Sequence, residues 1–284
     1  MAGPQPQPLV CVFFKLPPSL QSVPRIHEIA WTVFLPQLNR LNDAFQAVQT
    51  THPSPEAQKI WSEARQSAAK KMSRLQELAF LNYDTAGNFL LFVKASRLGR
   101  NNPEAYHTFL TRAHQAAKKS GSVQEVLLKF REDIRIVVGQ ITTLMSGNGK
   151  DVSSFTSESS QSMLELATAV EECNAILEGH REELKEVQRQ KLDENDNHPS
   201  EEEFQMVEEK WQAFSNSADA DEYKWHALQR EIRGFEDDDE PPMTYNYPTT
   251  PAMHTNSSKR PRVPFWRKFF RRVSSCLSVK KFVR

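Results

Sequence analysis

A metal site inside a helical bundle is the first chemistry that the spacing of polar residues suggests. Glu104 and His107 are three positions apart, and His114 follows seven positions later, so the three could share one helix face. Metal sites in bundles commonly use two Glu-x-x-His motifs that face the interior. Only one such motif is present here, at a predicted helix start, where a glutamate favours the positive end of the helix dipole. We therefore predict two solvent-facing histidines, no bound metal and no cofactor.

The glycine-containing loop at residues 146–151 (SGNGKD) offers a second chemistry, the binding of a nucleotide phosphate. The phosphate-binding pattern GxxxxGK[ST] requires an earlier glycine, but Leu144 stands in that position, and Asp151 replaces the hydroxyl residue. We predict a turn between two helices at this point.

Nucleophilic chemistry has equally little support. The three cysteines, Cys11, Cys173 and Cys276, are isolated and have no CxxC spacing, which predicts neither a disulfide framework nor a zinc site and fits a reducing compartment. No Ser/His/Asp or Cys/His motif with a recognisable local context occurs. We therefore expect a protein that is not an enzyme.

The strongest signal is the charge of residues 259–284 (KRPRVPFWRKFFRRVSSCLSVKKFVR). The whole chain has 36 basic and 36 acidic residues, and this segment holds ten of the basic ones and none of the acidic ones. The rest of the chain therefore carries 26 basic residues against 36 acidic ones. Overall neutrality thus hides an acidic body and a basic tail.

The tail also separates apolar from polar residues if it is helical. At about 100° per residue, the seven apolar residues of 265–278 fall within an arc of about 140°, and the seven basic or hydroxyl residues fall on the remaining arc. The apolar residues are Phe265, Trp266, Phe269, Phe270, Val273, Cys276 and Leu277. Such a short helix is marginal in water, but a bilayer surface would bury its aromatic face and attract its charges.

The tail therefore predicts binding to anionic membrane lipid. Basic residues near an anionic leaflet add attraction to the burial of apolar side chains. Cys276, on the apolar face, is a candidate lipidation site, and Ser274, in the context Arg-Arg-Val-Ser, is a candidate phosphorylation site. The candidate membrane-binding residues are Phe265, Trp266, Arg267, Lys268, Phe269, Phe270, Arg271, Arg272, Val273 and Leu277.

Three alternatives use the same segment. Lys259, Arg260 and Arg262 resemble a short nuclear localisation signal, and the tail could contact nucleic-acid phosphates, although the acidic body would repel them. A basic amphipathic helix also suits the apolar groove of a protein partner. Finally, the helix could pack back onto the acidic body.

The elements that carry this tail are predicted to be helices. Only nine residues are glycine, and apolar residues recur at steps of three and four along most of the chain. We expect an all-α, elongated multi-helix bundle, with Pro36 kinking the first helix, Gly87 interrupting the second and Gly121 separating a third from a fourth. The heptad-spaced segments 163–187 and 204–235 are expected to form a long antiparallel helical hairpin, broken near Asp221.

Two seam residues of the segment 163–187 carry titratable groups. Cys173 is expected to be a small packed residue. For His180 we predict a packed or register-setting role, with a pH-sensitive role as the alternative.

Composition divides the chain into four parts. We expect a Pro-rich irregular N-terminus (1–23), the helical bundle (24–234), a disordered acidic and Pro-rich linker (235–263) and the basic amphipathic helix (264–284). No apolar run is long enough to span a membrane, and the N-terminus does not resemble a secretory signal. The expectation is a cytoplasmic, peripheral membrane protein that perturbs membranes or acts as a scaffold and associates with a protein partner or itself. The alternative is a nuclear or partner-binding adaptor.

Overall fold

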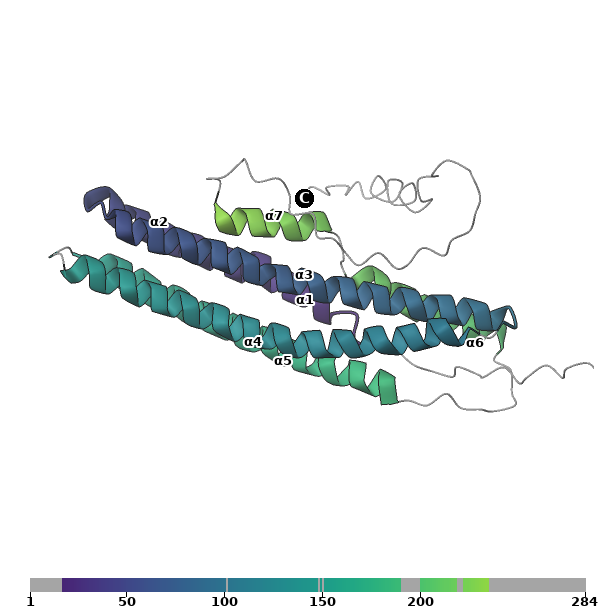
Figure 1. Ribbon diagram of the computed structural model, residues 1–284. Coiled ribbons are helices and arrows are strands. Elements are labelled where there is room, and N and C mark those ends of the chain that lie inside the picture. The colour runs from purple at the N-terminus through teal and green to yellow at the C-terminus, as the bar shows by residue number, and fades with distance from the viewer. Residues whose placement is uncertain are drawn as a thin grey trace, which may run out of the picture. The chain divides into compact units, whose positions relative to one another are not determined.

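The computed structural model describes residues 17–100, 102–147, 149, 151–189, 200–218 and 222–234. Within these ranges all regular structure is helical and no strand occurs, which confirms the predicted all-α bundle (Figure 1). The predictions for residues 1–16, for the linker and for the tail lie outside the described ranges.

Three long helices form the centre of the fold. They are α3 (Pro55–Arg97), α4 (Pro103–Gly147) and α5 (Ser153–Arg189), and α4 packs against both of the others. Ser54 caps α3, because its side chain accepts a hydrogen bond from the backbone N–H of Ala57 at 3.4 Å. The short connections make the successive helices antiparallel, as the ribbon shows (Figure 1).

Two shorter helices follow one another along α3. The helix α6 (Glu201–Ser217) begins with a capping box made by Ser200 and Glu203, and α7 is Glu222–Arg233. A break was predicted near Asp221; α6 ends at Ser217 and α7 begins at Glu222, and Asp221 itself lies outside the described residues. The principal contacts of both helices are with α3, so the predicted pairing of 163–187 with 204–235 is not the main one.

The first helical run packs against α5 and has an unusual turn. It comprises α1 (Ser22–Ile29), a π-helical turn η1 (Ala30–Phe34) and α2 (Leu35–Thr51). Pro36 is the second residue of α2, two positions after the end of the π-helical turn. Because proline has no N–H to donate, the regular series of i to i−4 backbone hydrogen bonds cannot continue through Pro36. The wider π-helical turn accommodates the missing hydrogen bond. The predicted feature was a kink at Pro36; the structure shows this π-helical turn just ahead of it.

Two predicted helix breaks are wrong. Gly87 lies inside the continuous helix α3, and Gly121 lies inside the continuous helix α4. A glycine in a helix interior costs only about 1 kcal/mol relative to alanine. Packing along both faces of these long helices outweighs that cost.

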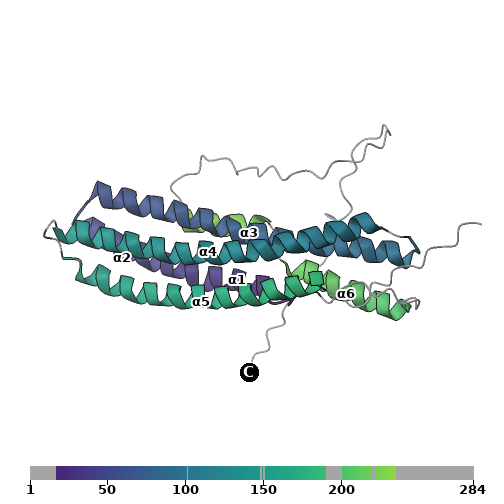
Figure 2. The same cartoon turned by 60° about the horizontal axis from the view of Figure 1, so that its bottom comes forward.

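The core divides along the length of the long helices. In what we call the α2 half, α1, α2 and α7 pack against α3–α5 around a cluster that includes Phe34, Phe45 and Phe130. In the α6 half, α6 covers a second cluster that includes Phe89, Phe109 and Trp211. Figure 2 shows α6 near one end of the long helices and α2 near the other.

Candidate functional site

A buried polar layer lies between the two halves of the core. Asn82 on α3 and Ser120 on α4 have no exposed surface, and His180 on α5 is 1% exposed. Along each helix the polar residue stands between members of two different apolar clusters. On α5, for example, His180 stands between Leu177 and Leu184. The Ser120 hydroxyl donates to the Ala116 carbonyl at 3.0 Å, so its hydrogen bond stays within α4.

Within the described residues, a hydrogen bond between His180 and Asn82 joins α5 to α3 across this layer. The His180 Nε2 lies 3.1 Å from the Asn82 Oδ1, and because Oδ1 only accepts, Nε2 carries the hydrogen of the neutral ring. The His180 Nδ1 and the Asn82 Nδ2 are buried and contact no hydrogen-bonding atom of the described residues. Burial lowers the pKa of His180 from 6.5 to about 4.

A second polar arrangement fixes the end of the bundle that leads to the linker. The Arg65 Nε donates to the Ile232 carbonyl at 2.7 Å and its Nη2 donates to the Glu231 carbonyl at 3.1 Å, which satisfies the C-terminal end of α7. Gly234 follows with φ of +81°. Trp225, in the same helix, is buried against the ring of His27 on α1, with centroids 4.8 Å apart. The last described helix, α7, is therefore held against α3 by Arg65 and against α1 by Trp225.

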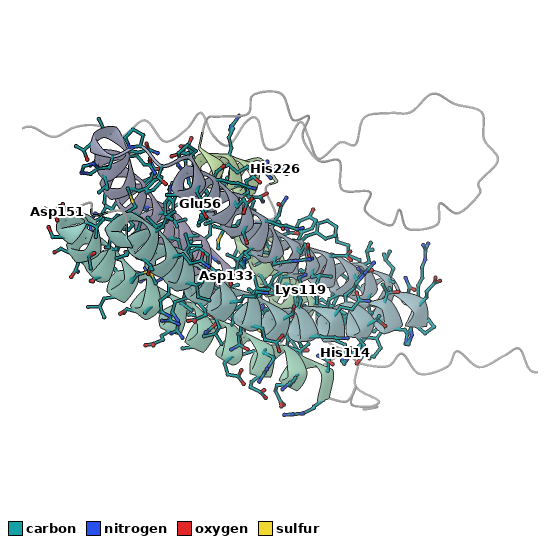
Figure 3. The ribbon with its side chains drawn as sticks, turned by 60° about the vertical axis from the view of Figure 1, so that its left-hand side comes forward. Glu56, His114, Lys119, Asp133, Asp151 and His226 are labelled. Carbon is teal, nitrogen blue, oxygen red and sulfur yellow. The ribbon has the colours of Figure 1, made fainter. Side chains whose placement is uncertain are left out.

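The metal candidates lie on the solvent-exposed surface of α4. Glu104, His107 and His114 are all exposed, and Figure 3 shows His114 on the outside of α4. No group of three or more His, Cys, Asp or Glu side chains suited to a metal ion occurs among the described residues.

The two remaining candidates for chemistry, Cys173 and the loop at residues 146–151, have contacts that are typical of structural roles. Cys173 is fully buried in the α2-half core, and burial, with a smaller effect of Glu172, raises the pKa of its thiol to about 12. Such a thiol is not a nucleophile at neutral pH, and the predicted packing role is confirmed. At the predicted interhelical turn, the Asp151 carboxylate accepts a hydrogen bond from the Ser153 N–H at 2.9 Å at the start of α5.

Acidic and basic residues concentrate on different helices. Together α5 and α6 carry thirteen acidic and four basic residues, whereas α3 and α4 carry eight acidic and thirteen basic ones. Ion pairs join α3 to α4, among them Lys71 with Asp133 at 2.9 Å and Glu77 with Lys119, a region seen in Figure 3. The acidic character predicted for the body is therefore strongest on α5 and α6.

Sequence reasoning did not identify Asn82 or Arg65. For Asn82 a signal existed, since Leu78, Asn82, Thr85 and Phe89 follow one another at core spacing along α3 and two of them are polar. Nothing in the sequence marks Arg65, because its partners are backbone carbonyls of a distant helix.

All predicted membrane-binding, lipidation, phosphorylation and localisation residues lie between 259 and 284, outside the described ranges. Among the helices that the structure does describe, none is long and apolar enough to cross a membrane. Comparison with known proteins gives no match to a protein-family model, to a curated protein or to a solved structure.

Proposed function

We propose that this chain is a non-enzymatic helical protein that binds anionic membrane surfaces through its C-terminal basic aromatic helix, with the bundle as a scaffold. The observation that carries the proposal is the separation of seven apolar from seven basic or hydroxyl residues over 265–278. The bundle supports it indirectly, because its apolar side chains are largely occupied in its own core.

The charge pattern of the bundle is compatible with this role. A body that was acidic all round would be repelled by an anionic bilayer within about 8 Å, the screening length at physiological salt. The excess of basic residues on α3 and α4 gives the molecule a side that can approach such a surface. Membrane perturbation and scaffolding are both open to a protein of this design.

The apolar face of the tail can be tested in the full-length protein. Replacing Phe269 and Phe270 by Asn should reduce co-sedimentation with phosphatidylserine-containing vesicles at least tenfold, because two aromatic side chains are removed from the buried face. The matched control replaces Ser275 and Ser278 on the polar face by Asn and should bind as the natural protein does. Equal binding by both variants would show that the apolar face makes no contact with lipid.

A second candidate function, a nuclear or partner-binding adaptor, is favoured by Lys259, Arg260 and Arg262 alone. Replacing these three residues by Ala should leave vesicle binding largely intact under our proposal. Loss of nuclear accumulation in that variant, with lipid binding retained, would instead support the adaptor.

A further inference from the structure

A buried imidazole occupies the boundary between the α2 half and the α6 half of the bundle. On α5, His180 stands between Leu177 of the first core cluster and Leu184, which packs in a small separate cluster with alanines of α4. On α3, Asn82 stands in the same way between Ala79 and Ala86. The hydrogen bond between these two side chains therefore crosses the core where apolar packing changes partners.

The surroundings of His180 suit only the neutral ring. Its Nε2 is bonded to Asn82, its Nδ1 meets no acceptor among the described residues, and its ring lies beside that of Phe214 on α6, with centroids 6.3 Å apart. A second proton, on Nδ1, would create a buried N–H without an acceptor and a charge without a counterion. Both are costly inside a protein.

The charged groups around the layer are engaged with one another. On α3, Glu77 pairs with Lys119 of α4 and Asp84 pairs with Arg112 of α4. On α5, Arg181 pairs with Glu178, Lys185 pairs with Glu182, and Glu183 accepts a hydrogen bond from the Ser19 N–H ahead of α1. On α6, Glu208 pairs with Arg97 of α3. None of these groups contributes to the lowered pKa of His180, which has burial as its cause. Among the described residues, none of these carboxylates is therefore placed to compensate a proton on the ring.

Two helices are seen to contact His180, α3 through Asn82 and α6 through Phe214, and α6 is the shorter of the two. It has 17 residues, against 37 to 45 for α3, α4 and α5, and its principal neighbour is α3 alone. It contributes Trp211 and Phe214 to the core, and Phe214 is the α6 residue that lies beside His180. Displacement of α6 is thus the smallest change that would give the imidazole access to water.

We propose that α6 is held on the bundle in part by packing of Phe214 beside the neutral His180 ring, which Asn82 positions, and that protonation of the His180 Nδ1 releases α6. Release uncovers an aromatic surface that α3, α4 and α6 otherwise share, made of Phe89, Phe109, Trp211 and Phe214. This inference concerns the bundle and does not depend on the function proposed for the tail.

The direction of the pH dependence follows from the base being buried in its neutral form. The contribution of neutral His180 to the attachment of α6 is fully present above the ordinary histidine pKa of 6.5. It is lost as the pH falls from 6.5 towards the lowered pKa of about 4. At pH 5 the equilibrium for release should be about thirtyfold higher than at pH 7.5.

Amide hydrogen exchange of the full-length protein at pH 7.5 and pH 5.0, corrected for intrinsic rates, tests the proposal. Protection of the α6 amides should fall about thirtyfold, whereas protection of α2 should change little. His180→Gln keeps an amide opposite Asn82 but cannot titrate, so its α6 protection should be nearly the same at both pH values. The matched control is His114→Gln, an exposed histidine on α4, which should behave as the natural protein does.

Each variant is compared with itself at two pH values, so a general loss of stability in His180→Gln does not obscure the result. The proposal is overturned if α6 protection in the natural protein is unchanged at pH 5.0. It is also overturned if His180→Gln loses as much protection between the two pH values as the natural protein does.

Discussion

At the scale of single residues, backbone conformation and local contacts determine which glycines can be replaced. Gly234 has φ of +81°, and a Cβ at this position would lie 3.0 Å from an Arg65 guanidinium nitrogen. Gly139 is helical and exposed, and a Cβ there would meet nothing within 4 Å. The same substitution should therefore have opposite effects at the two positions.

We expect Gly234→Ala to lower the free energy of unfolding by about 1–2 kcal/mol, because it strains the backbone and displaces the Arg65 clamp on α7. Gly139→Ala should raise it by about 0.5–1 kcal/mol, because alanine favours the helix interior. Urea denaturation followed by circular dichroism measures both. A stabilised Gly234→Ala variant would mean that this residue does not hold the conformation described.

At the scale of secondary-structure elements, periodicity predicted that the chain is helical but not how long its helices are. The breaks predicted at Gly87 and Gly121 do not exist, because a single glycine weakens a helix by far less than packing against the neighbouring helices stabilises it. At Pro36 a kink was predicted, and the structure has a π-helical turn that ends two residues before it. The choice of α3 as the partner of α6 was not predictable, because heptad spacing marks an apolar stripe without naming what covers it.

The attachment of α6 depends chiefly on one aromatic cluster. Trp211 has no exposed surface, and its ring lies 4.3 Å from that of Phe89 and 5.5 Å from that of Phe109, measured between centroids. Trp211→Ala should lower the free energy of unfolding by about 3–5 kcal/mol, because it leaves a cavity between α3, α4 and α6.

Met206→Ala, on the same helix but 37% exposed, is the matched control and should change the free energy of unfolding by less than about 0.5 kcal/mol. Denaturation curves of the two variants give the comparison. Similar small losses in both would contradict the packing described for α6.

At the scale of the whole molecule, opposite charges are sorted along the chain and among its helices. The tail carries ten basic residues and no acidic ones, α3 and α4 carry an excess of basic residues, and α5 and α6 an excess of acidic ones. The difference between tail and body was evident from the sequence. The difference among helices became meaningful only once the helices were defined and assigned to neighbours.

The central claim is that the tail provides the membrane contact, and co-sedimentation with phosphatidylserine-containing vesicles at physiological salt tests it most directly. The full-length protein is compared with a chain that ends at Ser258, which keeps every helix of the described bundle. We predict that the full-length protein sediments with these vesicles and not with purely zwitterionic ones, and that the shortened chain stays in solution with both. Sedimentation of both chains to the same extent, or of neither, would contradict the claim.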